Sequence, residues 1–263
     1  MVRSATDGHA KRPRLPAAEA AIISGSGLAV VPAGLTVEDE IPYAELGWPL
    51  GTVVGHRSRL LVASGSVGTV ALACGRSHRY EGFSAAELER PVRDLAAAGV
   101  RRLVITCATG SLAPDLRPGD VVVAHTVIDL QRAPRAHAPR LEVCSPAAAL
   151  AAAGVLAPDM AARTGVYVAV SGPQYETPAE AAWLGRFGDV VGMSAVHEVR
   201  AAGACGLPVH LVAAVTNRAG ASLAHEEVLT VARDVADGLQ RSLGQLLWCQ
   251  EAWPADGVSG DGG

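Results

Sequence analysis

The chain of 263 residues is long enough for one large α/β domain and less suited to two small ones. Hydrophobic residues make up 49% of it and charged residues 18%, which is enough apolar material for a sizeable core. Its net charge of −4 gives no general electrostatic basis for binding nucleic acids or anionic membranes, so we expect neither as a partner.

The N-terminal part predicts a mobile tail over residues 1–18, because glycine, proline, alanine and charged residues alternate there without periodicity. An apolar strand is expected over 20–23, and the sequence SGSG at 24–27 turns sharply after it. Successive glycines let backbone N–H groups converge on an anion, and the Ser26 hydroxyl can add a donor. The same residues are also typical of an ordinary Gly-Ser turn.

Three short strands are expected next, over residues 52–54, 59–63 and 67–74, with turns between them. His56 lies on the first of these turns, where a lone histidine is most often solvated. The last strand leads directly into the motif GRSHRYEG at 75–82.

This motif predicts an oxyanion site. Alternate side chains of an extended segment share a face, so Arg76, His78 and Tyr80 are expected to point into one pocket. A guanidinium can hold two oxygens of a phosphate or carboxylate, and an imidazole and a phenol can add hydrogen bonds. Taken alone, the motif also fits a solvated strand end with an ordinary charge cluster.

The rest of the chain alternates helices and strands. Ser84 and Glu87 form a capping box that predicts the start of a helix, and a strand over 102–106 follows. A helix between two apolar strands favours parallel strands joined by a right-handed crossover. Further strands are expected over 121–128, 166–170, 189–192 and 210–215, and further helices over 145–162 with a break near Pro158, from Pro178 onward, over 195–204 and over 225–247.

Several of these strands end in polar or glycine-containing segments, which contain Ser26, Arg76 with His78, Ala108, Tyr175 with Glu176, Met193 with Ser194, and Asn217. Ligands of α/β proteins collect at the carboxyl ends of strands. The repetition therefore predicts an enzyme site more strongly than any single motif does.

The five cysteines, at positions 74, 107, 144, 205 and 249, form no CxxC pair and are odd in number. We therefore expect free thiols and neither a disulfide framework nor a zinc site. No signal peptide and no apolar run of about 18 residues is found, so we expect a soluble protein of the cytoplasm.

Together these segments resemble the trimeric class of purine nucleoside phosphorylases, which includes the methylthioadenosine phosphorylases. The resemblance covers roughly residues 20–248, and its segments come in the family's order. The most specific segments are GRSHRYEG at 75–82, SGPQYETPAE at 171–180, GMSAVHEV at 192–199, Thr216-Asn217 and His225-Glu226-Glu227.

The resemblance implies an α/β fold with a single domain over residues 19–250, a mixed, mostly parallel central sheet flanked by helices, and tails at 1–18 and 251–263. It also implies a homotrimer. Its substrates would be a small-molecule nucleoside and inorganic phosphate as co-substrate, with no metal or organic cofactor.

The resemblance also assigns roles to single positions. For phosphate it implies Ser26, Arg76, His78, the backbone N–H of Ala108, Ser194, and His56 near the entrance. For ribose it implies Tyr80, Met193 and His225. For the purine it implies Tyr175, Glu176 and Asn217, and we expect His78, Glu176 and Asn217 to carry the catalysis.

The implied reaction is phosphorolysis of a purine nucleoside to the free base and ribose 1-phosphate. Asn217 and His225 resemble the inosine- and guanosine-cleaving members, which favours 6-oxopurines. Methylthioadenosine cleavage is the alternative among enzymes. A paralogue that binds nucleoside or phosphate with little turnover is the alternative outside them.

Some positions depart from the family pattern. Cys107 stands where the 6-oxopurine branch has asparagine, and His197 stands where a proline is usual. Ser77 and Arg79 replace residues that are usually apolar, and the segment 129–146 is short and lacks an aromatic residue. We expect this protein to differ from its relatives at these places.

Overall fold

The structure of the protein is a computed structural model that describes residues 15–25, 27–53, 57–66, 68–131, 140–221 and 225–253, with side chains in the last range from residue 230 onward. Most of the two expected tails lies outside these residues. Where the described chain reaches into them, Ala18, Ala252 and Trp253 are buried.

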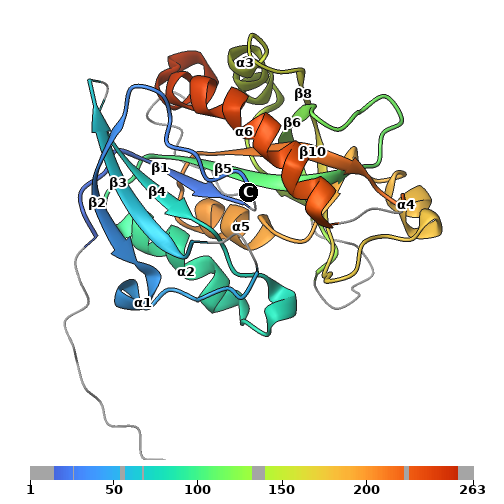
Figure 1. The fold of residues 1–263 in the computed structure, drawn as a ribbon, viewed down its shortest axis with the longest axis horizontal. Coiled ribbons are helices and arrows are strands. Elements are labelled where there is room, and N and C mark those ends of the chain that lie inside the picture. Colours follow the sequence, from blue (N-terminus) through green and yellow to red (C-terminus); the bar gives the residue numbers. More distant parts are fainter. Residues whose placement is uncertain are drawn as a thin grey trace, which may run out of the picture.

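In the described residues a ten-stranded sheet crosses the molecule (Figure 1). Its strands are β1 Ala20–Ser24, β2 Thr36–Pro42, β3 Arg59–Gly65, β4 Gly68–Cys74, β5 Arg102–Ser111, β6 Val121–Asp129, β7 Arg140–Glu142, β8 Ala162–Ala169, β9 Val190–Gly192 and β10 Val209–Arg218. The helices are α1 Tyr43–Leu46, α2 Ala85–Ala97, α3 Pro146–Leu156, α4 Pro178–Leu184, α5 Val196–Ala204 and α6 His225–Trp248, with 3₁₀ turns η1 Arg79–Glu81 and η2 Gln250–Ala252.

The sheet is mixed, as predicted, and its order is β10-β6-β8-β9-β5-β1-β4-β3-β2, with β7 paired to β6. Parallel pairings join β4, β1, β5 and β10. Strand β5 pairs with both β10 and β9, so β5, β10, β6, β8 and β9 form a closed ring. The ring brings the ends of strands that are far apart in sequence to one place.

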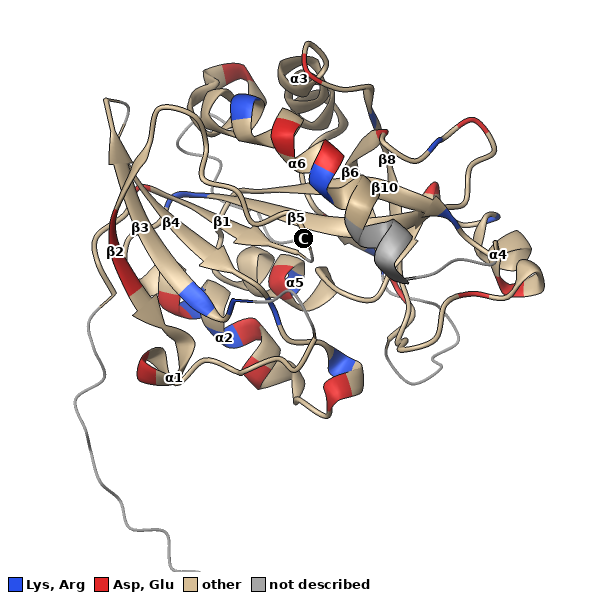
Figure 2. Ribbon diagram, viewed as in Figure 1, with Lys and Arg blue, Asp and Glu red and all other residues tan. Residues whose placement is uncertain are grey.

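Helices cover both faces of the sheet, with α2 and α5 on one side and α3 and α6 on the other (Figure 1). Strand β5 contributes to both cores, because Leu103 and Ile105 pack on one side and Val104 packs on the other. Figure 2 shows charges of both signs on the helices and connecting segments, while the central strands are mostly uncharged. No helix in the described part of the chain has the length and apolar character needed to cross a membrane.

The expected helix starts are confirmed. Ser84 and Glu87 exchange hydrogen bonds at the start of α2, and Thr177 and Glu180 do the same at the start of α4. The crossover through α2 joins the parallel strands β4 and β5, as predicted, although β1 lies between them in the sheet. The helix expected over 145–162 ends at Leu156, and β8 already begins at Ala162.

The strand expected over residues 52–54 is not formed at residues 52 and 53, and Val54 lies outside the described residues. Thr52 and Val53 lie in an irregular segment, and the Glu81 carboxylate accepts hydrogen bonds from the backbone N–H and the hydroxyl of Thr52. A side chain from another segment therefore takes the place of a strand partner. The pattern also missed β2 and α1, since β2 is an almost fully exposed edge strand with no apolar alternation to signal it.

The C-terminal segment packs against the residues at which β5 and β10 begin. The Trp253 indole donates a hydrogen bond to the Leu246 carbonyl at 2.9 Å, and its ring centroid lies 4.4 Å from that of buried His210. The Arg102 guanidinium lies 5.9 Å from the ring centroids of both Trp248 and Trp253. Trp253 therefore acts as a packing residue.

Replacing Trp253 by alanine should lower the free energy of unfolding by about 3 kcal/mol, because it removes a buried ring together with its hydrogen bond. Trp183→Ala is the matched control, since Trp183 is 50% exposed and its loss should cost less than about 1 kcal/mol. Urea denaturation followed by circular dichroism measures both values. Equal losses in the two variants would contradict a stabilising role of the C-terminal segment.

Candidate active site

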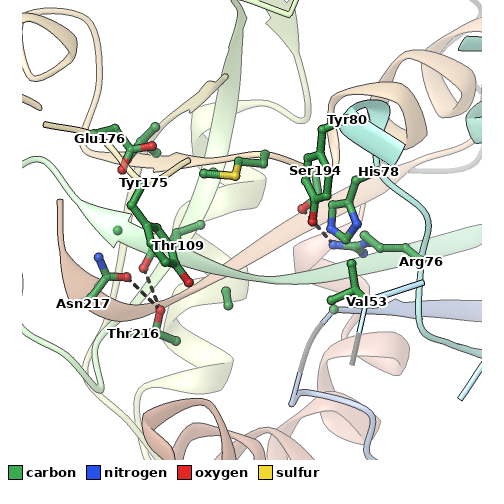
Figure 3. Close-up of a pocket in the computed structure, with 16 residues that line it drawn as sticks. Val53, Arg76, His78, Tyr80, Thr109, Tyr175, Glu176, Ser194, Thr216 and Asn217 are labelled. Atoms are coloured by element: carbon green, nitrogen blue, oxygen red, sulfur yellow. Dashed lines mark hydrogen bonds between the residues drawn. The ribbon is translucent and has the colours of Figure 1, made fainter. Parts of the chain in front are cut away.

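A pocket of about 720 Å³, including the space at its mouth, opens where β4, β5, β9 and β10 end (Figure 3). The structure brings together in its lining all the predicted site residues whose side chains it describes, namely Arg76, His78, Tyr80, Ala108, Tyr175, Glu176, Met193, Ser194 and Asn217. Ser26 and His56 lie outside the described residues, and so does the side chain of His225. Figure 3 shows Arg76 and His78 at one end of the pocket and Glu176 and Asn217 at the other.

Arg76 is held in place from three sides. Its Nη1 donates to Ser194 Oγ at 3.2 Å, its Nη2 donates to the Ile23 carbonyl at 3.2 Å, and its Nε lies 3.1 Å from Glu198 Oε1. The Arg76 and Glu198 side chains are only 4% and 9% exposed. Because the guanidinium is fixed before any ligand arrives, the end of the pocket that it lines is a preorganised anion site. Glu198 was not predicted as a site residue, although it lies within the motif GMSAVHEV.

His78 is oriented by Glu81, three residues further along the chain. Glu81 Oε1 accepts a hydrogen bond from the His78 backbone N–H at 2.7 Å and lies 3.0 Å from Nδ1 of the ring. The carboxylate thus favours a proton on Nδ1, so a ligand in the pocket would meet the Nε2 edge. Burial lowers the pKa of His78, and the positive charge of Arg76 acts in the same direction, against the opposing effect of Glu81.

Glu81 is itself kept ionised. Burial alone would raise the pKa of its carboxyl group, but hydrogen bonds from Thr52 and His78 outweigh that effect and lower the pKa below 4.5. Sequence reasoning missed Glu81, although it lies inside the motif at 75–82. The signal was its spacing of three residues from His78, which suits a 3₁₀ turn.

Tyr80 lines the pocket, but the backbone conformation that directs its side chain there differs from the expected one. The chain is extended at His78, but it then enters the 3₁₀ turn Arg79–Glu81, so simple alternation does not continue to Tyr80. The turn stacks the Tyr80 ring on the His78 ring, with centroids 4.9 Å apart and planes 13° from parallel. The expectation that Arg76, His78 and Tyr80 share a pocket is confirmed, and its geometric basis is corrected.

The segment around Ser194 has an unusual backbone. The Tyr167 hydroxyl donates to the Ser194 carbonyl at 2.9 Å and accepts from the Ser194 backbone N–H at 3.3 Å. The next residue, Ala195, has φ of 65° and begins α5. A non-glycine residue rarely adopts this conformation, and here it turns the chain sharply so that Ser194 faces Arg76.

Asn217 is directed into the pocket by an irregularity in β10. The register against β5 shifts between Val215 and Asn217, which marks a β-bulge. The Thr216 hydroxyl lies 3.2 Å from Asn217 Oδ1 and donates to it, and Asn217 Nδ2 donates to the Arg218 carbonyl at 3.2 Å. An amide has more donor and acceptor positions than these two, so Asn217 can still both donate to and accept from a ligand.

Glu176 lies at the same end of the pocket as Asn217 (Figure 3). Burial raises the pKa of its carboxyl group, and the nearby Glu180 acts in the same direction. Together, a carboxylate and an amide can bind adjacent donor and acceptor atoms on the edge of a flat heterocycle. The opposite end, which Arg76 lines, is suited to an anion, so the pocket has room for two reactants of different chemistry.

The residues that depart from the family pattern mostly contact the protein itself. The Ser77 hydroxyl donates to the Pro49 carbonyl at 3.2 Å, and the Arg79 guanidinium donates to the Phe83 carbonyl. Cys107 is buried, and burial raises the pKa of its thiol to about 12, so it remains neutral. All five cysteines are free thiols, as predicted. The described residues contain no group of three or more side chains suited to holding a metal ion.

Comparison with known proteins matches residues 19–247 to the phosphorylase superfamily. The chain is 36% identical over 247 residues to the purine nucleoside phosphorylase of Mycobacterium tuberculosis, covering 87% of this chain and 88% of that protein. A structure of Schistosoma mansoni purine nucleoside phosphorylase in complex with inosine gives a TM-score of 0.70 at 32% identity, covering 90% of this chain and 91% of the other. A structure of the Schistosoma mansoni enzyme in complex with adenosine gives a TM-score of 0.71 at 30% identity, covering 91% and 92%.

The pKa of His78 should lie below 6.5 in the ligand-free protein, because burial disfavours the charged ring. Glu81→Gln should lower it further, since the carboxylate supplies the hydrogen bond and charge that favour protonation. NMR titration of the ring measures both. The neutral ring stabilises the fold above pH 6.5, and that contribution is lost as the pH falls through the lowered pKa.

Glu87→Gln is the control for this titration, because Glu87 is a capping carboxylate at the start of α2 that does not contact His78. It should leave the pKa of His78 unchanged. A His78 pKa at or above 6.5 in the wild-type protein, or one that rises in Glu81→Gln, would contradict the role assigned to burial and to Glu81.

Proposed function

Because this chain belongs to the phosphorylase superfamily, and within it to the purine nucleoside phosphorylases, we propose that it cleaves 6-oxopurine nucleosides, with inosine and guanosine favoured. One observation supports this best: the fixed cation Arg76 and the pair Glu176 and Asn217 lie at opposite ends of one pocket (Figure 3). A nucleoside whose base is held at one end presents its sugar to an anion at the other. The structures of the Schistosoma mansoni relative with inosine and with adenosine support a purine nucleoside as the substrate class.

At the anion end, inorganic phosphate is the second substrate. Arg76 and Ser194 hold it beneath C1′ of the ribose, together with the backbone N–H of Ala108. His78 adds a hydrogen bond through Nε2. The negative charge of a bound phosphate dianion favours the protonated ring and so raises the pKa of His78. The contribution of these groups is positioning and electrostatic stabilisation, since the nucleophile is the phosphate oxygen itself.

At the base end, Glu176 accepts the N1–H of the purine, and Asn217 binds at N7. The bond from C1′ to the purine nitrogen stretches first, which places positive charge on the ribosyl group and negative charge on the purine. A phosphate oxygen then bonds to C1′ from the opposite face. The purine leaves with the bonding electrons and takes up one proton, which is balanced by the proton that the attacking hydrogen phosphate loses, so the products are the free base and ribose 1-phosphate.

The ribose lies between these ends. Tyr80 and Met193 line its site, and Tyr175 lies against the purine. The family resemblance assigns His225 to the 5′-hydroxyl. From the family resemblance alone, we assign Ser26 to the phosphate site and His56 to its entrance. We propose that the reaction requires no metal or organic cofactor, and that the protein is a homotrimer, as the resemblance to its family implies.

Purified protein should release hypoxanthine from inosine only when inorganic phosphate is present, because phosphate supplies the atom that bonds to C1′. The assay compares inosine, guanosine, adenosine and methylthioadenosine, each with and without phosphate. We expect the highest kcat/KM for the two 6-oxopurine nucleosides. Phosphate-independent cleavage would contradict the proposed reaction, and fastest cleavage of methylthioadenosine would contradict the proposed substrate class.

Asn217→Asp should reverse the preference, because it replaces an N–H donor by an oxygen that can accept from a 6-amino group. We expect the ratio of kcat/KM for inosine to that for adenosine to fall about 100-fold. Asn217→Ala is the control, since it removes both the donor and the acceptor of the amide. It should lower kcat/KM for inosine and for adenosine without reversing the preference between them. An unchanged ratio in the aspartate variant would mean that the base is held by other groups.

A further inference from the structure

Gln131 lies behind the pocket wall and has no role in the site described so far. It follows β6 by two residues, and its Nε2 donates to the Val170 carbonyl at 2.8 Å and to the Met193 carbonyl at 3.1 Å. The amide orientation follows from these partners, since an amide oxygen would be repelled by two carbonyl oxygens. One side chain thus joins the ends of β8 and β9.

This contact begins where the backbone pairing stops. The last hydrogen bond between the two strand ends runs from the Val170 N–H to the Gly192 carbonyl at 2.9 Å. Met193 comes directly after β9 and lines the pocket. The Gln131 amide therefore fixes the first backbone carbonyl beyond the end of the strand.

Gln131 is held by a buried ionic network. Asp129 Oδ1 accepts from the Gln131 backbone N–H at 3.0 Å, and Asp129 Oδ2 accepts from Arg200 Nη2. Arg200 Nη1 lies 3.4 Å from Glu89 Oε1 and 3.2 Å from His197 Nδ1. The network links β6, α5 and α2, so the position of Gln131 depends on the packing of three elements.

Met193 has little freedom to compensate for a moved backbone. Gly172 has φ of 69°, and a Cβ atom built on it would overlap the Met193 sulfur and lie 3.1 Å from the Tyr80 ring. The Met193 side chain is thus confined between Gly172 and the pocket. A shift of the Met193 backbone would therefore also move the Met193 side chain that lines the ribose site.

Ser194, the next residue, is fixed independently of Gln131. Its backbone is bonded to Tyr167 and its hydroxyl to Arg76. Loss of the Gln131 contacts should therefore disturb the ribose side of the pocket more than the phosphate side.

We propose that Gln131 is a positioning residue that holds the Met193 carbonyl and thereby sets the affinity for the nucleoside. This inference rests on the proposed function, because it takes Met193 as part of the ribose site. The side chain touches neither substrate. It acts through the backbone of the pocket wall.

Gln131→Met keeps the length of the side chain and removes both hydrogen bonds. We expect the dissociation constant for inosine, measured by equilibrium dialysis without phosphate, to rise about tenfold. The KM for phosphate should stay within about twofold, since Ser194 keeps its own contacts. Ser242→Ala is the matched control, because it removes a buried hydrogen bond to Asp159 outside the pocket and should leave the inosine affinity unchanged.

Gln131→Glu adds a test that a merely structural role would not pass. An ionised carboxylate faces two carbonyl oxygens and weakens inosine binding, whereas the protonated acid can donate one hydrogen bond. The affinity of Gln131→Glu for inosine, relative to that of Gln131→Met, should therefore increase as the pH falls from about 8 to about 5. The other charged groups of the network, namely Asp129, Arg200, His197, Glu89 and Arg93, are present in both variants and form the common background of the comparison.

Unchanged inosine affinity in Gln131→Met would overturn the proposal. It would also be overturned by an equal loss of affinity for inosine and phosphate. The same holds if the ratio of the inosine dissociation constants of Gln131→Glu and Gln131→Met does not change with pH. The dialysis measurement needs no turnover. If the wild-type protein binds inosine but does not cleave it, the proposed reaction fails while the role of Gln131 is still decided.

Discussion

Arg76 and Glu198 form an ion pair with 3.1 Å between Nε and Oε1, and both side chains are almost fully withdrawn from solvent. Burying two charges is costly unless their remaining hydrogen-bonding groups are satisfied. Here the guanidinium also donates to the Ile23 carbonyl at the end of β1 and to Ser194 before α5. One cation thus joins β4, β1 and α5, and the same cation faces the pocket. The anion end of the pocket is consequently part of the core.

The pocket is also where the backbone departs from regular structure. Asn217 follows a bulge in β10, Ala195 has a positive φ at the start of α5, and Gly172 has a positive φ against Met193. Such conformations cost free energy and persist only where the surrounding packing enforces them. The closed ring of β5, β10, β6, β8 and β9 supplies that packing. It brings these irregular segments to one place.

His197, which departs from the family pattern, lies in the layer behind the pocket. His197 and Arg200 on α5 are hydrogen-bonded to each other, and Arg200 reaches Asp129 and Glu89. His197 must be neutral at Nδ1 to accept from Arg200, and burial lowers its pKa in agreement with that state. The pocket wall near Met193 is thus supported by a charged network, in addition to the apolar core beneath it.

Short-range patterns in the sequence were sufficient to predict the caps Ser84 and Thr177, most strands, and the residues of the strand ends that meet in the pocket. These features depend on neighbours within three or four residues, so periodicity and spacing reveal them. The family resemblance then grouped Arg76, Glu176 and Asn217 into one site, and the structure places them together in one pocket.

Only the tertiary structure decided which groups hold those residues in position. Glu198 reaches Arg76 across 122 residues of sequence. Ser194, Met193 and Asp129 likewise take Tyr167, Gln131 and Arg200 as partners from segments that the pattern could not align. The N–H of Thr52 bonds to the Glu81 carboxylate in an irregular segment, and not to a neighbouring strand as expected. Local propensity sets which elements form, whereas buried charges and backbone groups take partners wherever the fold brings them together.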